Sequence, residues 1–157
     1  MYAENEICAV QRRGPSASEL GLTTKQLAAM LEVRELLASN VIRHVDPVDV
    51  NRDERSFLAR TFGETPQRFN MNYTIQHKGC GTVACIGGWT ALRAGMSRRA
   101  GDKFVKLADG GLRELFYPLV PGSNNKVDQN VTNEQAVRAI DNFVATGKPD
   151  WNSARGY

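Results

Sequence analysis

The sequence is poor in histidine and cysteine and has no long apolar run. It contains two histidines and three cysteines in 157 residues, and the odd number of cysteines excludes a complete internal disulfide framework. The longest run without a charged residue, 79–92, is far too short to span a bilayer. The first residues have neither a basic stretch nor an apolar core, so they do not form a secretory signal. We therefore expect reduced thiols and an intracellular protein with no membrane partner.

The overall composition is that of an ordinary globular protein. Hydrophobic residues make up 41% of the chain and charged residues 24%, and the net charge of +3 is too small to indicate nucleic-acid binding by itself. A chain of 157 residues can bury the core of one domain. We expect a flexible N-terminal arm over residues 1–22 and a single globular helical domain over residues 23–157.

Apolar periodicity and capping residues predict about five helices. They cover 23–44, 48–62, 82–94, a segment that opens at Ser97 or Asp102, and 132–147. In the fourth, Phe104, Val105 and Leu107 are expected to face inward. The last is the best marked, because Thr132 and Gln135 match a capping box and Gly147 is a typical C-terminal residue.

The helix over 82–94 is expected to lie at the centre of the fold. It would be capped by Thr82, and its two glycines, Gly87 and Gly88, predict a close crossing by another element, since glycine is otherwise unfavourable in helices. Residues 69–75 alternate apolar and polar side chains, as an extended connector or half of a hairpin does. The expected fold is therefore mainly α, a compact single domain around a central glycine-rich helix, with at most a short β-hairpin.

Cys80 is the first candidate for chemistry, because a thiol just before a helix has its thiolate stabilised by the free amides. The Cys80-Gly81 pair, followed by a second cysteine at Cys85, is similar to papain-type and bacteriocin-processing peptidases. Those enzymes need a histidine after the cysteine in the chain, and none follows His77. A cysteine hydrolase or transferase using Cys80 with His77 or His44, oriented by Asp46 or Asp49, stays an alternative. We assign no catalytic residue.

Metal and disulfide chemistry are disfavoured by the spacing of the cysteines. Cys80 and Cys85 would differ by about 140° around a helix, so they could not join His77 and His44 at one metal unless Cys80 lay outside the helix. A disulfide between these cysteines would need to span about 8 Å in a regular helix, and Cys8 is an equally good partner for either. No Walker motif is present. We expect no metal and no cofactor.

A basic stripe is the second candidate site. It consists of Arg93, Arg98, Arg99, Lys103 and Lys106. Positions 99, 103 and 106 share one helical face, which predicts a surface for an acidic protein partner or for nucleic acid. A solvated helix face is the simplest interpretation, and no aromatic residue is interleaved.

Residues 80–89 read Cys-Gly-Thr-Val-Ala-Cys-Ile-Gly-Gly-Trp and resemble the core of a group of small uncharacterised proteins from bacteriophages and bacterial genomes. The resemblance extends to Phe-Asn-Met at 69–71, Leu-Phe-Tyr-Pro at 115–118, Thr-Gly at 146–147 and Asp-Trp at 150–151. It implies a phage or prophage origin and no particular reaction.

These observations favour a non-enzymatic accessory protein that binds another protein, as a virion component or a modulator of host machinery. Its location would be the host cytoplasm or the virion. The cysteine enzyme and nucleic-acid binding through the basic stripe remain the alternatives.

Overall fold

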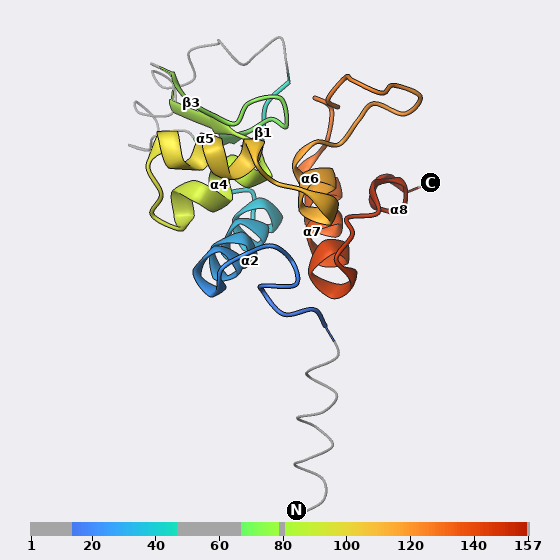
Figure 1. The fold of residues 1–157 in the computed structure, drawn as a ribbon. Helices are drawn as coiled ribbons and strands as arrows, with labels where there is room; N and C mark the ends of the chain where they lie inside the picture. The colour runs from blue at the N-terminus through green and yellow to red at the C-terminus, as the bar shows by residue number, and fades with distance from the viewer. Residues whose placement is uncertain (1–13, 47–66, 79–80, 157) are drawn as a thin grey trace, which may run out of the picture.

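A computed structural model describes residues 14–46, 67–78 and 81–156 (Figure 1). Within these ranges lie the helices α2 (Thr24–Ala38), α4 (Ile86–Arg93), α5 (Arg98–Lys106), α6 (Gly110–Phe116), α7 (Asn133–Thr146) and α8 (Trp151–Arg155), and the strands β1 (Arg43–His44), β2 (Gln67–Phe69), β3 (Ile75–Lys78) and β4 (Gly81–Ala84). The helix expected over 48–62 and residues 1–13 of the expected arm lie outside the described residues.

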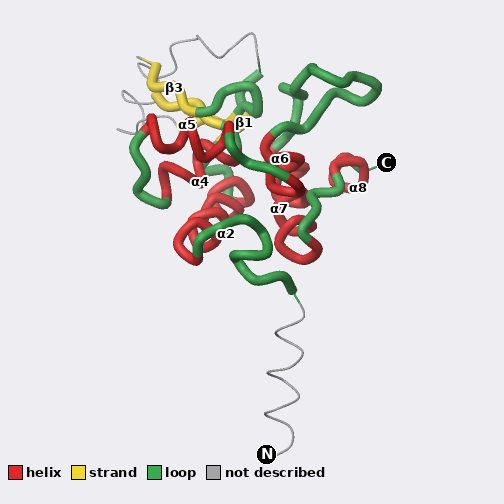
Figure 2. Tube along the Cα trace, viewed as in Figure 1, coloured by secondary structure: helices red, strands yellow, loops and turns green. Residues whose placement is uncertain are grey.

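The four strands form one mixed sheet, so the prediction of a mainly α fold with at most a hairpin was wrong. The strand order is β1-β2-β4-β3; β2 pairs in parallel with β1 and β4, and β3 pairs antiparallel with β4. Figures 1 and 2 show the sheet along one side of the helices. The stretch expected to be extended over 69–75 instead turns between β2 and β3, where Asn70 donates to the Val45 carbonyl and accepts from the Asn72 amide, both at 3.0 Å.

The central helix begins later than expected, which corrects the predicted start at Thr82. Thr82 lies in β4, and α4 starts at Ile86 with Cys85 as its N-cap. The Cys85 sulfur accepts a hydrogen bond from the Gly88 amide at 3.3 Å. The error has a physical cause: residues 81–84 become a strand by pairing with two segments earlier in the chain, and no local signal encodes that pairing.

α4 is the hub of the core, as expected. Its first six residues, Ile86 to Ala91, are all buried. A side chain at Gly87 would collide with Val105 of α5 and Phe116 of α6, whereas one at Gly88 would overlap the backbone carbonyl of Thr74. Gly87 therefore marks the expected helix crossing, and Gly88 marks a close approach by the turn before β3.

The predicted bounds and caps of α7 are confirmed, and so is the predicted start of α2. Both have capping boxes, Thr23 with Gln26 and Thr132 with Gln135, and Gly147 ends α7 with a left-handed backbone (φ 83°). α2 ends at Ala38 instead of continuing toward residue 44, and the next residues turn into β1.

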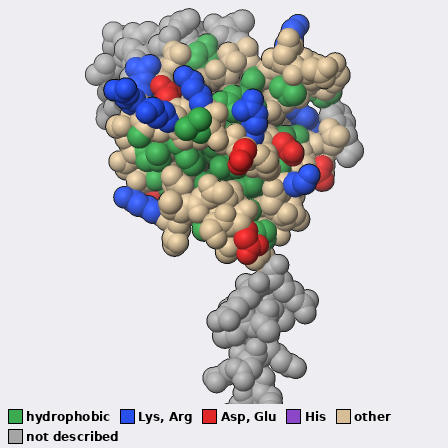
Figure 3. Space-filling model, viewed as in Figure 1, with side chains coloured by type: hydrophobic (Ala, Val, Ile, Leu, Met, Phe, Trp, Pro, Cys, Tyr) green, Lys and Arg blue, Asp and Glu red, His purple; other side chains and the backbone are tan. Residues whose placement is uncertain are grey.

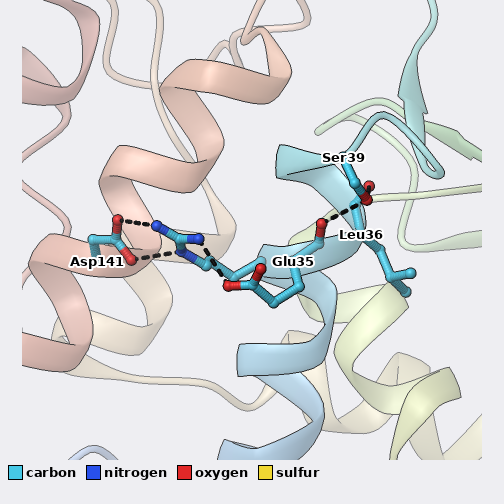
Figure 4. A network of polar contacts seen from close by, with 5 residues as sticks. Glu35, Leu36, Ser39 and Asp141 are labelled. Carbon is cyan, nitrogen blue, oxygen red and sulfur yellow. Dashed lines mark hydrogen bonds and ion pairs between the residues drawn. The ribbon is translucent and has the colours of Figure 1, made fainter.

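A polar network joins α2 and α7 (Figure 4). The guanidinium group of Arg34 donates two hydrogen bonds to the Asp141 carboxylate, each at 3.0 Å, and a third to Glu35 at 2.8 Å. Asn133, the first residue of α7, adds a second link, because its side-chain amide donates to the carbonyls of Leu37 and Ile42 at 3.0 and 2.7 Å. These contacts fix the two helices against each other and hold the start of β1.

The part of the predicted arm that the structure describes packs on this body, since Leu20 and Leu22 are both buried. At the other end of the described chain, Trp151 is partly buried and packs against the core. Over the described ranges, the structure contains no helix whose length and apolar character would allow it to cross a membrane.

Candidate binding face on helix α5

α5 is held against the core by one side and presents a basic side to solvent. Gly101 and Val105 are buried, with Gly101 close to Ile75 of β3 and Ala91 of α4. Phe104 is partly buried and meets Phe116 edge to face, with ring centroids 5.5 Å apart. Ser97 caps the helix by accepting from the Ala100 amide at 3.2 Å. The orientation of the exposed side is therefore fixed by packing.

Four members of the predicted basic stripe gather on the exposed side of α5. They are Arg98, Arg99, Lys103 and Lys106, all exposed, and Figure 3 shows lysine and arginine side chains clustered over this helix. Among the described residues, none of the four has an ion pair with a carboxylate. Asp102 and Asp109 lie on the same part of the surface, but the cations outnumber them.

The fifth member, Arg93, differs from the other four. It lies at the end of α4 and forms an ion pair with Glu32 of α2. The Arg93 guanidinium lowers the pKa of the Glu32 carboxyl. Arg93 therefore joins two helices, and the structure does not bring it into the group of unpaired cations.

The position of the first two arginines is unfavourable for the helix itself. Arg98 and Arg99 occupy the first turn of α5, which contains no acidic residue. The amino end of a helix carries a partial positive charge, so cations there reduce helix stability, whereas Lys103 and Lys106 near the carboxyl end are favourable. Helix stability alone accounts for the two lysines but not for the two arginines.

An apolar groove runs beside these cations. Its volume is about 320 Å³, and it is lined by Gly21, Met96, Ala100, Lys103, Phe104, Leu107, Ala108, Asp109 and Leu112. Leu107 is 79% exposed, the most exposed of the large hydrophobic residues that the structure describes. In Figure 3 hydrophobic side chains lie next to the basic cluster. We call the four cations, Leu107 and this groove the α5 face.

Sequence reasoning missed the groove because it placed Leu107 inside. Leu107 follows Phe104 at helical spacing, but α5 ends at Lys106 and Leu107 is its C-cap. The backbone therefore leaves the helix at this residue. The Asp-Gly-Gly run at 109–111 was the signal that the helix was about to end.

The main argument for cysteine chemistry was that Cys80 lies just before a helix, and the structure does not support it. Cys80 lies outside the described residues, and since α4 begins at Ile86, Cys85 is the thiol at the helix entrance. Cys85 is buried, and burial raises the pKa of its thiol to about 11, although amides at the start of α4 oppose the shift. A thiol with this pKa is protonated at neutral pH and is a poor nucleophile.

The two histidines are not brought together. His44 is in β1 and His77 in β3, and these strands form opposite edges of the sheet. The His44 Nε2 atom lies 3.0 Å from the Gln129 carbonyl, and its Nδ1 atom lies 3.9 Å from the Asp46 carboxylate. The described parts of the chain contain no group of three or more histidine, cysteine or acidic residues that could hold a metal ion.

Comparisons of the chain with protein-family models, with curated proteins and with solved structures found no match.

Proposed function

We propose that the protein acts by binding another protein through the α5 face. The occupant would be an acidic segment with a large apolar side chain that seats in the groove beside Leu107. The exposed Leu107 side chain carries this proposal, because a solvated basic helix has no need of an apolar groove along its side. Exposed apolar surface bordered by charged groups is typical of protein interaction sites.

The charges on the α5 face support an acidic occupant. Arg98, Arg99, Lys103 and Lys106 have no carboxylate partner among the described residues, so an approaching acidic segment would displace no existing ion pair. Charges on the rim of an interface mainly increase the rate of association and select the partner, whereas buried apolar side chains supply most of the affinity. The face combines both kinds of contact.

The resemblance of residues 69–151 to phage and prophage proteins supports a biological setting for this binding. We propose a non-enzymatic accessory protein, either a virion component or a modulator of host machinery, located in the host cytoplasm or the virion.

Nucleic acid is the second candidate ligand, because four cations on one helix, with no carboxylate partner in the part of the chain that the structure describes, would also attract phosphates. It accounts for the cations but not for Leu107 and the groove. The affinity of binding through phosphate contacts alone would fall steeply as the salt concentration rises, and it would not change when Leu107 is replaced.

The test uses labelled synthetic peptides and a short DNA duplex. One peptide places leucine and phenylalanine between aspartates and glutamates, a second replaces its acidic residues with lysine, and a third replaces its apolar residues with serine. We expect the first peptide alone to bind, and we expect Leu107→Ser to weaken it about tenfold or more. Lys103→Glu should weaken it as well. Leu31→Ser is the matched control, since Leu31 is 42% exposed on α2 and does not line the groove.

Failure of the acidic peptide to bind would contradict the proposal. Tight DNA binding that Leu107→Ser leaves unchanged would replace it with the nucleic-acid function. Equal losses for Leu107→Ser and Leu31→Ser would show that the peptide does not recognise this face.

A further inference from the structure

The N-terminal part of the chain enters the helical body beside the groove of the α5 face. Gly21 lines the groove next to Leu112. The Leu22 amide donates to the Ala17 carbonyl at 2.9 Å, so the chain turns back on itself just before α2. Gly14, the first described residue, therefore lies within roughly 20 Å of Gly21.

The residues that precede this turn have the composition that the α5 face is expected to bind. Residues 1–13, which lie outside the described residues, read Met-Tyr-Ala-Glu-Asn-Glu-Ile-Cys-Ala-Val-Gln-Arg-Arg. The first ten contain two carboxylates, Glu4 and Glu6, close to the apolar side chain of Ile7, and they contain no lysine or arginine. The two arginines come after this stretch, next to the body. We call residues 1–10 the arm segment.

The arm segment is long enough to reach the groove. Ile7 is seven residues before Gly14, and an extended chain of seven residues spans about 25 Å. This length exceeds the distance of roughly 20 Å between Gly14 and Gly21. A tether this short holds a segment near its site at an effective concentration of about 1 mM. Even weak docking would therefore keep the face occupied for much of the time.

Charge complementarity favours the same contact. The four cations of the α5 face have no carboxylate partner among the described residues. One of them, Lys103, lines the groove together with Leu107. Glu6 and Ile7 are neighbours in the chain, so an Ile7 side chain seated beside Leu107 would bring the Glu6 carboxylate close to Lys103.

We propose that the arm segment docks in the groove of its own chain and competes there with the protein partner. This inference rests on the proposed function, because it concerns the regulation of the same face. Two carboxylates balance only half of the four cations, so a more acidic partner displaces the arm segment. The segment therefore lowers the affinity for weak partners and makes the face more selective for acidic ones.

The size of the effect follows from the effective concentration. If the arm segment docks with a dissociation constant of about 0.1 mM, an effective concentration of about 1 mM leaves the face free roughly a tenth of the time. The apparent affinity for a partner then falls about tenfold. A change of this size is measurable with the labelled acidic peptide.

The first test uses full-length variants in which the arm segment is altered. One variant combines Glu4→Gln with Glu6→Gln, and the other is Ile7→Ser. We expect each to bind the acidic peptide about fivefold to tenfold more tightly than the parent protein, because the face is no longer occupied. Glu19→Gln is the matched control, since Glu19 is an exposed carboxylate of the same arm outside the segment, and its affinity should equal that of the parent.

The second test adds the arm segment as a separate molecule. A synthetic peptide of residues 1–10, with Cys8→Ser to prevent oxidation, is titrated into a mixture of the Ile7→Ser protein and the labelled acidic peptide. We expect it to displace the labelled peptide. When the protein also carries Leu107→Ser, the synthetic peptide should bind more weakly.

The outcomes separate this inference from the proposed function. If the arm variants bind the acidic peptide only as tightly as the parent, while Leu107→Ser still weakens binding, the inference is overturned and the proposed function stands. If none of these proteins binds the acidic peptide, the proposed function fails and the inference fails with it. Self-association of the parent protein that Ile7→Ser abolishes would place the arm segment on a second copy and overturn the contact within one chain.

Discussion

α4 and α5 follow one another in the chain and pack together, yet they differ in almost every physical respect. α4 is surrounded by β4, α2, α5 and α6, and Gly87 and Gly88 allow its neighbours to approach its backbone. α5 contacts the core with one side only and presents four cations on the other. The fold depends on close contacts around α4, whereas α5 has exposed groups that contribute nothing visible to the core. Substitutions in the two helices should therefore separate stability from binding.

The largest expected effect is that of Gly88→Ala in α4. The new methyl group would overlap the Thr74 carbonyl, which belongs to the backbone and cannot rotate away. The turn before β3 must then separate from the helix, and we expect the free energy of unfolding to fall by about 3 kcal/mol or more. Urea denaturation measures this change.

Gly14→Ala is the matched control for Gly88→Ala, since a methyl group there has the Val144 carbonyl as its nearest neighbour at an ordinary 3.8 Å. We expect little change in its unfolding midpoint. Equal stability of Gly88→Ala and the parent protein would show that α4 is not closely packed against this turn.

The thiol at the entrance to α4 predicts a loss of stability at high pH. Burial raises the pKa of Cys85 from 9.0 to about 11. Below pH 9 the thiol is protonated in both the folded and unfolded states. Between about pH 9 and 11 only the unfolded state loses the proton, so the free energy of unfolding decreases, by up to roughly 3 kcal/mol.

The measurement compares unfolding of the parent protein and Cys85→Ser across this pH range. Lysines, tyrosines and the other cysteines titrate in both proteins, so the difference in slope isolates Cys85. Identical slopes would mean that the Cys85 thiol is accessible to water. An accessible thiol would also react quickly with alkylating reagents at neutral pH.

α7 and β4 show which parts of this fold a sequence can predict. The start and end of α7 are encoded locally, by Thr132 with Gln135 and by Gly147, and the prediction was correct. β4 depends on pairing with β2 and β3, and Thr82, a residue type that often caps helices, predicted a helix start there instead. The actual cap of α4 is Cys85, a residue type that rarely signals a helix start.

The α5 face, like the fold, could be predicted only in part from the sequence. The cations of α5 repeat at helical spacing, so their common face could be read from the sequence. The groove could not be predicted from this spacing, which places Leu107 on the buried side of the helix. Leu107 is exposed because α5 ends at Lys106 and Leu107 is its C-cap. The contact between α6 and α8 could not be predicted either, because the hydrogen bond from Trp151 to the Glu114 carbonyl joins residues far apart in the chain.

A smaller effect is expected when a hydrogen bond from each tryptophan is removed. In Trp89→Phe, the indole N–H that lies 2.9 Å from the Arg68 carbonyl in the core is lost. We expect the free energy of unfolding to fall by about 1–3 kcal/mol. Trp151→Phe removes an equivalent bond to the Glu114 carbonyl at a partly exposed position, and its loss should be smaller. Thermal unfolding of both variants gives the comparison, and a larger loss for Trp151→Phe would contradict the central role of α4.

The smallest effect on stability, and the sharpest separation from binding, is expected from charge reversals at the two ends of α5. Arg99→Glu places an anion in the first turn, where it interacts favourably with the helix dipole, and should raise the free energy of unfolding by about 0.3–1 kcal/mol. Lys106→Glu places the same charge in the last turn and should lower it by a similar amount. Both variants remove a cation from the α5 face, so both should weaken binding of the acidic peptide. The free energy of unfolding should therefore rise in Arg99→Glu and fall in Lys106→Glu, whereas peptide binding should weaken in both. Chemical denaturation measures the first quantity and peptide titration the second, both at the same ionic strength. If binding instead followed stability, strengthening in Arg99→Glu and weakening in Lys106→Glu, the peptide would be responding to the order of the helix and not to its charge.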